Sequence, residues 1–477
     1  MTPLDVPWLE IALVLGLVGA CAVSRITDPA RAYRWGVGFC GAVFACTFLA
    51  WLAFFERQAP GFSLQTRLFG SQVLALDELN APLVPAVALL HLLTAVATAQ
   101  TKMRRFSFSW SLAAETIHLA TLSAVDPWML VTLLTMGTIP PYLELMNRGR
   151  PTRVYVGHMA LFVVLLIVGW AAFDATSRLG PPAVWATVAL MAAILMRCGA
   201  MPAHCWITDW FEHASFGNGL LYVIPLPGVY AAIRLVLPEA PDWVLHAIGV
   251  VSLVTAVYAA GMAVVQREAR RFFAYLFLSH ASLVLVGLQL LTELTLTGAF
   301  CLWFSVIISL GGFGLTLRAV EARFGRLALV DHHGLYEHSP ALAICFLLTG
   351  LASVGFPGTL GFISTELLVD GAIVANPLVG VGVVAATMLN GIAVVRAYFL
   401  LFTGARHASM VQLGIRRRER FAVLTLAALI LGGGIYSKPG VLSREKAAEA
   451  LLHERQRRVG LDPHSAPTPL FPLPAAK

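Results

Sequence analysis

The chain is a succession of apolar segments, each separated from the next by a short polar loop. A helix that crosses a lipid bilayer needs about 20 apolar residues. By this criterion the pattern predicts about fourteen spanning helices, near residues 8–24, 35–55, 81–100, 108–125, 127–146, 154–173, 183–205, 218–236, 243–265, 271–291, 294–317, 340–371, 377–402 and 421–436. The predicted fold class is therefore all-α, that of a polytopic membrane protein.

Two of the apolar segments are interrupted in the middle. The segment 191–210 contains Arg197, Pro202 and His204, and the segment 342–371 contains Pro357, Gly358, Gly361 and Glu366. A break in a membrane helix frees backbone groups, so it persists only where protein or water surrounds it. Two such breaks in corresponding halves of a chain indicate an internal repeat with an ion or substrate path between the halves.

The composition agrees with a membrane protein. Hydrophobic residues make up 58% of the chain and charged residues 12%, whereas about 25% of the residues in a soluble domain are charged. The net charge is +7. In a membrane protein the excess basic residues mainly lie in loops and set the topology, so we predict no nucleic-acid partner. The seven cysteines lie in apolar stretches without a CxxC pair, so we expect free thiols and no metal site. No nucleotide or iron–sulfur motif is present, so no cofactor is predicted.

Basic residues gather in every second loop between the predicted helices. Because such loops face the cytoplasm, the pattern predicts that both termini lie on the non-cytoplasmic side. The loops concerned contain Arg25, Arg31 and Arg34; Lys102, Arg104 and Arg105; Arg148, Arg150 and Arg153; Arg267, Arg270 and Arg271; Arg318, Arg323 and Arg326; and Arg406 with Arg416–Arg420.

Four short motifs resemble those of one protein family. Residues 266–283, QREARRFFAYLFLSHASL, resemble the signature QxDxKRxxAYSSxSHxG of the antiporter-like subunits of respiratory complex I. Residues 201–209, MPAHCWITD, resemble the family's MPLHTWLPD; residues 355–366 resemble GLPGTxGFxGEF; and residues 139–142, IPPY, resemble IPMY. The motifs follow the family's order, and the most similar type is the subunit M of bacterial NADH:quinone oxidoreductase.

The resemblance implies fourteen helices, of which spans 4–8 and 9–13 form two inverted five-helix repeats with two broken helices. It also implies a multi-pass subunit of the inner (plasma) membrane that contacts other membrane subunits and passes protons or cations along buried ionisable groups. The corresponding division of the chain is 1–106 (helices 1–3, with an extramembrane segment near 56–80), 107–236 (first repeat), 243–402 (second repeat), 403–442 (last helix) and 443–477 (an exposed, charged, Pro-rich tail).

The ionisable residues that the family uses along its axis are mostly absent. Alignment on the motifs places Thr135 where the fifth-span Glu belongs and Arg197 at the seventh-span Lys. The eighth-span Lys becomes Leu226, the eleventh-span His becomes Val306, and the twelfth-span Glu or Lys becomes Thr365. The sequence therefore predicts a depleted proton relay.

Arg197 is the one axis position that keeps a charge. Arginine stays protonated where lysine can release a proton, so Arg197 is a poor proton carrier. A buried charge needs a partner, and Glu115 and Glu144 are the candidates, with Glu115 favoured. His118 lies three residues after Glu115, so both are expected on one helix face.

Three further residues complete the candidate proton path. His204 and His280 match family histidines, and imidazole titrates near pH ~6.5; the alternative is a neutral histidine that ties down a helix break. Glu366 lies beside the second break. An ionisable group inside the membrane is costly and indicates function, but Glu366 is also consistent with a carboxylate at a helix end near solvent.

Three functions fit these observations. The first is a proton-translocating subunit of an NADH:quinone oxidoreductase-type complex that is not itself catalytic. The second is the membrane subunit of a cation/proton antiporter or of a DAB-type inorganic-carbon uptake complex, which share this core. The third is a non-conducting scaffold, which the depleted relay favours. The sequence contains no nucleophile–base constellation of a free-standing enzyme.

Overall fold

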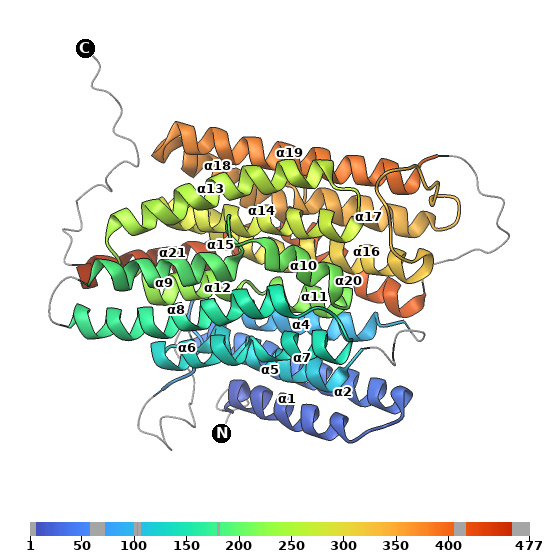
Figure 1. Cartoon of the computed structure of the whole chain (residues 1–477), viewed down its shortest axis with the longest axis horizontal. Helices are drawn as coiled ribbons and strands as arrows, with labels where there is room; N and C mark the ends of the chain where they lie inside the picture. The colour runs from blue at the N-terminus through green and yellow to red at the C-terminus, as the bar shows by residue number, and fades with distance from the viewer. Residues whose placement is uncertain are drawn as a thin grey trace, which may run out of the picture.

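The computed structural model is a bundle of helices whose long axes run roughly side by side (Figure 1). Within the described part of the chain every regular element is helical, apart from two isolated β-bridges. The residues described are 6–57, 72–99, 103, 106–178, 182–404 and 416–459. Part of the predicted extramembrane segment, 58–71, and the Pro-rich end, 460–477, lie outside them.

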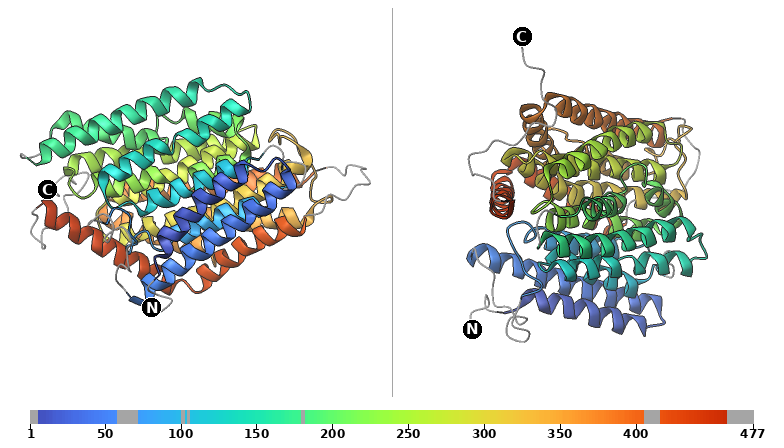
Figure 2. Two further views of the ribbon diagram at one scale, coloured as in Figure 1. Left: turned by 90° about the horizontal axis from the view of Figure 1, so that it is seen from below. Right: turned by 60° about the vertical axis from the view of Figure 1, so that its left-hand side comes forward.

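The N-terminal helices lie at one edge of the bundle and α18 and α19 at the opposite edge (Figure 2). They are α1 (Trp8–Ser24), α2 (Pro29–Arg57) and α4 (Leu83–Val96). Helix α1 packs on α2 and on α5. A Cβ atom on Gly16 would lie 2.1 Å from Oγ1 of Thr116, so only glycine allows this close approach of α1 to α5.

The first half of the core contains the helices of the first predicted repeat. They are α5 (Phe108–Ser123), α6 (Pro127–Met136), α7 (Ile139–Asn147), α8 (Arg153–Ser177), α9 (Val184–Cys198), α10 (Cys205–His213), α11 (Phe216–Val223), α12 (Pro227–Ala231) and the π-helix η3 (Ala232–Val236). Two N-caps fix where helices start: the side chain of Asp126 accepts from Met129 N at 2.7 Å and that of Ser215 from Asn218 N at 3.3 Å.

The second half, like the first, contains long helices, a π-helix and a broken helix, and the two helices α20 and α21 follow it. They are α13 (Asp242–Val265), α14 (Ala269–Gln289), α15 (Glu293–Ser305), the π-helix η4 (Val306–Leu310), α16 (Gly311–Phe324), α17 (Pro340–Ser353), α18 (Leu360–Ala375), α19 (Pro377–Phe402), α20 (Arg417–Ile435) and α21 (Lys438–Val459). That the two halves are inverted repeats stays a prediction.

Both predicted helix breaks are present. Helix α9 ends at Cys198, and the chain turns through Gly199, whose φ of 73° is left-handed, before α10 begins. Helix α17 ends at Ser353, and two glycines with φ of 85° and 82°, Gly355 and Gly358, precede α18. Glycine adopts this backbone conformation without steric cost, so these positions explain where the helices stop.

A third break was not predicted. Leu226, between α11 and α12, has a φ of 52° although it is not glycine. A left-handed leucine is strained and is held in place by its surroundings; Leu226 is 3% exposed and stands between two prolines.

Eight helices of the described chain are long and apolar enough to cross a membrane, and four shorter apolar helices accompany them. The chain is therefore a multi-pass membrane protein. The shorter helices are α1, α4, α9 and α17, and the last two are the first pieces of the broken segments. The count of fourteen spans stays a prediction.

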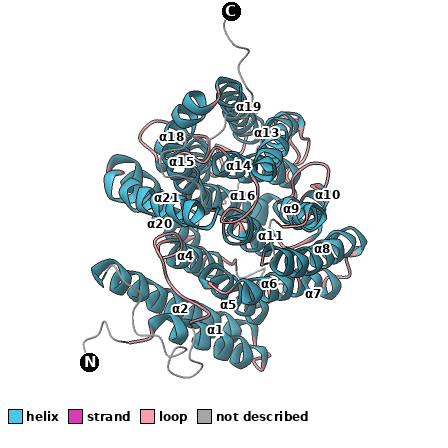
Figure 3. Cartoon of the chain, turned by 90° about the vertical axis from the view of Figure 1, so that its left-hand side faces the viewer, coloured by secondary structure: helices cyan, strands magenta, loops and turns pink. Residues whose placement is uncertain are grey.

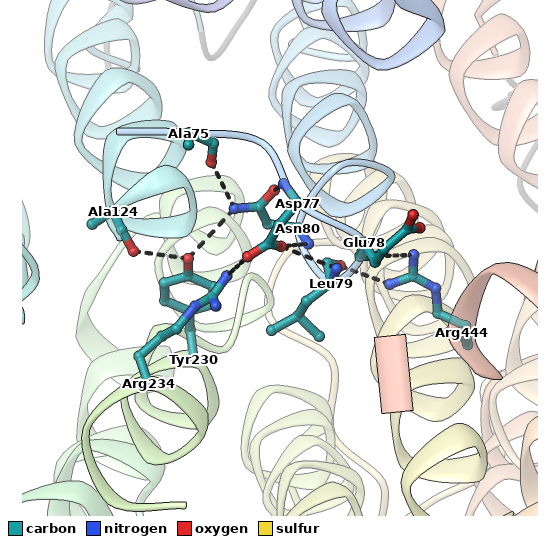
Figure 4. Close-up of polar contacts among 9 residues, drawn as sticks. All are labelled: Ala75, Asp77, Glu78, Leu79, Asn80, Ala124, Tyr230, Arg234 and Arg444. Carbon is teal, nitrogen blue, oxygen red and sulfur yellow. Dashed lines mark hydrogen bonds and ion pairs between the residues drawn. The ribbon is translucent and has the colours of Figure 1, made fainter. Parts of the chain in front are cut away.

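The C-terminal helix α21 lies across one end of the bundle, bent by 79° from α20 and beside α15 (Figure 3). One face of the predicted exposed tail is buried within 443–459, where Arg444 and Arg455 are each 3% exposed, whereas residues such as Arg457 on the other face are exposed. Arg444 donates to the carbonyl oxygens of Glu78 and Leu79, both at 2.7 Å (Figure 4). The many charged residues of this segment suggested a solvated tail. Its arginines instead donate hydrogen bonds to backbone carbonyl oxygens that have no partner within a helix.

Arg455 ties α21 to the segment that joins the two halves. Its guanidinium donates to the carbonyl oxygens of Leu237 and Ala240, at 2.5 and 3.0 Å, and pairs with Asp242 at 2.6 Å. With Arg444 it holds α21 against two separate loops.

We expect the double variant Arg444→Ala, Arg455→Ala to lower the free energy of unfolding by about 2–5 kcal/mol, since each loss leaves buried carbonyl oxygens unpaired. Thermal melting of the purified chain in detergent measures this. Arg457→Ala is the control: within the described residues Arg457 pairs only with Glu454, and its side chain is 75% exposed, so we expect almost no change. Equal melting of the double variant and the wild type would contradict the tethering role.

Candidate functional site

Arg197 is buried next to the first break without a carboxylate partner. It is 5% exposed, and its guanidinium carbon lies 4.5 Å from the ring centre of Tyr222 and 5.6 Å from that of Trp206. An aromatic face stabilises a buried cation by about 0.5–2 kcal/mol. Within the described residues no ion pair of Arg197 is found, and its Nε has no hydrogen-bond partner.

The two acids predicted as partners of Arg197 bind elsewhere. Glu115 accepts a hydrogen bond from the thiol of Cys40 on α2, at 3.2 Å. Glu144, near the end of α7, lies 3.5 Å from Arg148 and accepts the backbone N–H of Ser215 at 3.2 Å. The prediction that Glu115 pairs with Arg197 is therefore wrong: Glu115 lies on the face of α5 that packs against α2.

His118 lies one turn after Glu115 and faces a second histidine that the sequence analysis missed. The ring centres of His118 and His91, on α4, are 5.8 Å apart. His91 is fully buried and His118 is 4% exposed. Both ring nitrogens of His91 and Nδ1 of His118 have no hydrogen-bond partner in the described protein. The ring of Tyr222 lies 6.3 Å from that of His118.

A pocket connects this cluster with Glu144. It encloses about 460 Å³, including the space at its mouth, between α5, the junction of α6 and α7, α10 and α11. Four of its lining side chains carry a buried polar atom without a partner in the described chain: Ser111 Oγ, His118 Nδ1, Trp210 Nε1 and Asn218 Oδ1. Buried polar atoms are almost always hydrogen-bonded, so a pocket lined by four unpaired ones is suited to hold water.

His204 and His280 stand at the two breaks and differ in their surroundings. The ring of His204 lies 5.4 Å from that of Tyr258 and 6.1 Å from that of Tyr275, and its Nδ1 has no partner in the described chain. His280 has a carbonyl oxygen beside each ring nitrogen, that of Leu276 2.8 Å from Nδ1 and that of Ser353 2.7 Å from Nε2, and a neutral ring donates to one of the two. His280 thus anchors the end of α17 at the second break.

Glu366 does not join the other candidates. It is exposed on the outer face of α18, as is Asp370 one turn later. Thr365, at the family's axis position, donates its hydroxyl to the carbonyl oxygen of Gly361 at 2.8 Å.

The remaining axis positions are apolar or locally bonded. Leu226 is 3% and Val306 1% exposed, and Thr135 donates its hydroxyl to the carbonyl oxygen of Val131 at 2.9 Å. A small cavity of about 210 Å³ between Arg197 and Leu226 is lined mostly by apolar side chains, among them that of Phe277. Apart from Glu366, the candidate proton-path residues therefore lie in the first half and at the breaks, whereas Leu226 and Val306 are apolar.

A polar network closes the opposite end of the first half (Figure 4). Asp77 forms an ion pair with Arg234 of η3. Asn80 donates to the hydroxyl of Tyr230 at 3.5 Å, and Tyr230 donates to the carbonyl oxygen of Ala124 at 3.0 Å.

The sequence held a signal for the missed histidine. His91 is an ionisable residue inside a predicted span, which is the criterion that selected His118. Its proximity to His118, 27 residues later, depends on how α4 packs against α5, which the sequence does not show.

These features define a class: a multi-pass membrane protein with two broken helices and buried ionisable side chains beside a pocket. The sequence model of the family described as NADH:quinone oxidoreductase/Mrp antiporter, TM, matches residues 155–390. The chain belongs to this family.

Similar sequences and structures agree. The NAD(P)H-quinone oxidoreductase chain 4 1 of a Nostoc species is 24% identical, over 99% of this chain and 97% of its own length. The F(420)H(2) dehydrogenase subunit M of Methanosarcina mazei is 27% identical over 38% of each chain. A chain of respiratory complex I from Thermus thermophilus superposes with a TM-score of 0.83 at 21% identity, covering 94% of this chain and 99% of its own. A chain of the Mrp complex from a Dietzia species gives 0.81 at 17% identity, with 95% and 100% covered.

Two buried arginines give opposite expectations for stability. Arg323 forms a nearly buried ion pair with Glu419. Glu419→Gln removes the acid of this pair, so we expect the free energy of unfolding to fall by about 3 kcal/mol or more. Arg197→Met leaves no acid behind, so we expect a change within about 1–2 kcal/mol. Thermal unfolding in detergent measures both; equal losses would show that Arg197 does have an acidic partner.

Proposed function

We propose that this chain is an antiporter-like, proton-translocating subunit of an NADH:quinone oxidoreductase-type complex in the inner (plasma) membrane. The names of its relatives support the type of complex. The observation that carries the proton-translocating role is the pocket that runs from Glu144 to His118, because its unpaired polar atoms suit water and its inner end meets titratable side chains.

The same residues support a relay that is confined to the first half. Arg197 cannot release a proton, and the axis beyond it continues through Leu226 and Val306. A proton that reaches His118 therefore has no titratable neighbour at these positions.

We propose that the basic loops face the cytoplasm and that both termini lie on the other side. The loops predicted to share one side contact each other: Arg270 pairs with Glu321 at 2.5 Å, and Arg271 with Glu212 at 2.5 Å. The excess of Arg and Lys in these loops supports the cytoplasmic assignment. By this assignment the pocket beside Glu144 opens to the cytoplasm.

We also propose that the outer face of α18 contacts another membrane subunit. Glu366 and Asp370 are exposed one turn apart on this apolar helix, and a carboxylate that faces lipid near the middle of a span costs about 2.5–3.5 kcal/mol. A neighbouring subunit that presents a basic side chain would remove this cost.

A non-conducting scaffold is the second candidate function, and the apolar axis favours it. The structural similarity to Mrp and complex I chains shows a shared fold and does not distinguish complex I from a cation antiporter.

Proton flux separates conduction from scaffolding. We expect liposomes that contain the full chain and an internal pH dye to equilibrate faster than protein-free liposomes. Glu144→Gln should slow this about tenfold, because it removes the charge at the mouth of the pocket. Glu239→Gln, an acid on the opposite side whose partner is Arg458, should leave the rate unchanged. Flux equal to that of protein-free liposomes would support the scaffold and contradict proton translocation.

Assembly tests the partner face. We expect Glu366→Lys to shift the chain from a large complex to smaller species in native electrophoresis of mildly solubilised membranes, because the two basic groups would repel. Val381→Lys places a lysine on the exposed surface of α19 and should leave the complex intact. An unchanged complex with Glu366→Lys would contradict a partner on α18.

A further inference from the structure

The strongest unexplained feature is the pair of histidines on α4 and α5. His91 and His118 come from helices outside the family's axis positions, and their ring centres are 5.8 Å apart. A histidine that only supports the fold is normally hydrogen-bonded, as His280 is through the ring N–H that faces a backbone carbonyl oxygen. His91 has no partner at either nitrogen within the described chain.

This arrangement carries an energetic cost. A neutral imidazole always presents one N–H donor and one bare nitrogen acceptor. A buried donor or acceptor without a partner destabilises a protein by about 1–3 kcal/mol. The pair is therefore a poor structural element, whereas two imidazoles whose ring centres are 5.8 Å apart can exchange a proton through one bridging water molecule.

Access to the pair is built into the fold. The pocket reaches His118 from Glu144, and its wall includes Gly137, at the junction of α6 and α7. Gly137 has the ordinary helical φ of −60°, so its role here is its small size. A Cβ atom there would lie 3.6 Å from the side chain of Ile117, and a larger side chain would extend into the pocket.

Charged and titratable groups from several helices surround the pair, and Arg318 of α16 donates to the carbonyl oxygen of Thr94 on α4, three residues after His91, at 2.9 Å. Glu115 and its partner Cys40 lie on the α2 side, one turn from His118. Tyr222 lies against His118 and also carries the guanidinium of Arg197. Arg197 supplies a permanent positive charge 4.5 Å from the ring centre of Tyr222, which opposes passage of a proton from the pair toward the axis.

We propose that His91 and His118 form the proton-binding site of the first half, in place of the Glu and Lys that the family carries on its fifth and seventh spans. A proton from the pocket binds His118; its transfer to His91 returns His118 to the neutral form and leaves His91 as the imidazolium. This inference rests on the proposed function, and it moves the proton site from α6 and α9 to α4 and α5.

The way out leads to the network of Figure 4. Ser123, at the end of α5, is fully buried and its Oγ has no partner in the described chain. The next residue, Ala124, accepts the hydroxyl of Tyr230, which contacts Asn80. Asp77, which accepts from Arg234, ends this line of polar groups on the side opposite to Glu144.

Flux through liposomes that contain the full chain tests the site. We expect His91→Gln and His118→Gln each to reduce the rate at least about tenfold, because glutamine keeps polar atoms but cannot carry the proton. His332→Gln, in an exposed loop, is the matched control and should keep the wild-type rate. Wild-type flux in both pair variants would overturn the proposal while leaving the proposed function intact.

Chemical modification tests the site without transport. We expect diethyl pyrocarbonate, followed by peptide mass spectrometry, to modify His118 in the folded chain. Gly137→Leu should reduce this modification about tenfold by filling the pocket, while His332 reacts as before. Modified His118 in a chain that shows no flux would contradict the proposed function but support an accessible histidine site. Unmodified His118 beside modified His332 would overturn the proposed access, whatever the flux.

Discussion

The constraint on which this structure depends is that a polar group inside a bilayer must find its partner within the protein or in enclosed water. Both breaks meet it with side chains from other helices. At the first break the backbone N–H of Met201 donates to Oγ1 of Thr255 at 3.0 Å, and Trp206 donates to the carbonyl oxygen of Met196 at 2.9 Å. At the second, His280 binds the carbonyl oxygen of Ser353.

The same constraint separates the groups that support the fold from those that suit transport. Arg444 and Arg455 donate hydrogen bonds to backbone carbonyl oxygens at one end of the bundle, and Arg455 also pairs with Asp242. His91 on α4 and His118 on α5 are buried, and ring nitrogens of both have no partner in the described chain. Leu226, at the third break, has a left-handed backbone although its side chain is apolar.

Periodicity and composition predicted the all-α membrane fold and the two breaks, because length, apolar runs and Pro-Gly pairs act locally. They did not predict the burial of α21, since a charged helix reads as solvated until the carbonyl oxygens it binds are known. The partner of Arg197 was wrong for a similar reason. Sequence shows that a buried cation needs compensation, but whether this comes from Glu115 or from the ring of Tyr222 depends on how the helices are rotated.

Measuring which buried side chains contact water tests most directly whether the proton path is confined to the first half. Trp210 lines the pocket and Phe277 the small cavity on the axis, and both are almost fully buried, at 1% and 2% exposed. Radiolytic hydroxyl labelling of the full chain in native membranes modifies side chains that contact water. If the proton path is confined to the first half, Trp210 will be strongly labelled and Phe277 will not be labelled. Labelling of Phe277 to the same extent would show a hydrated axis and contradict a proton path confined to the first half.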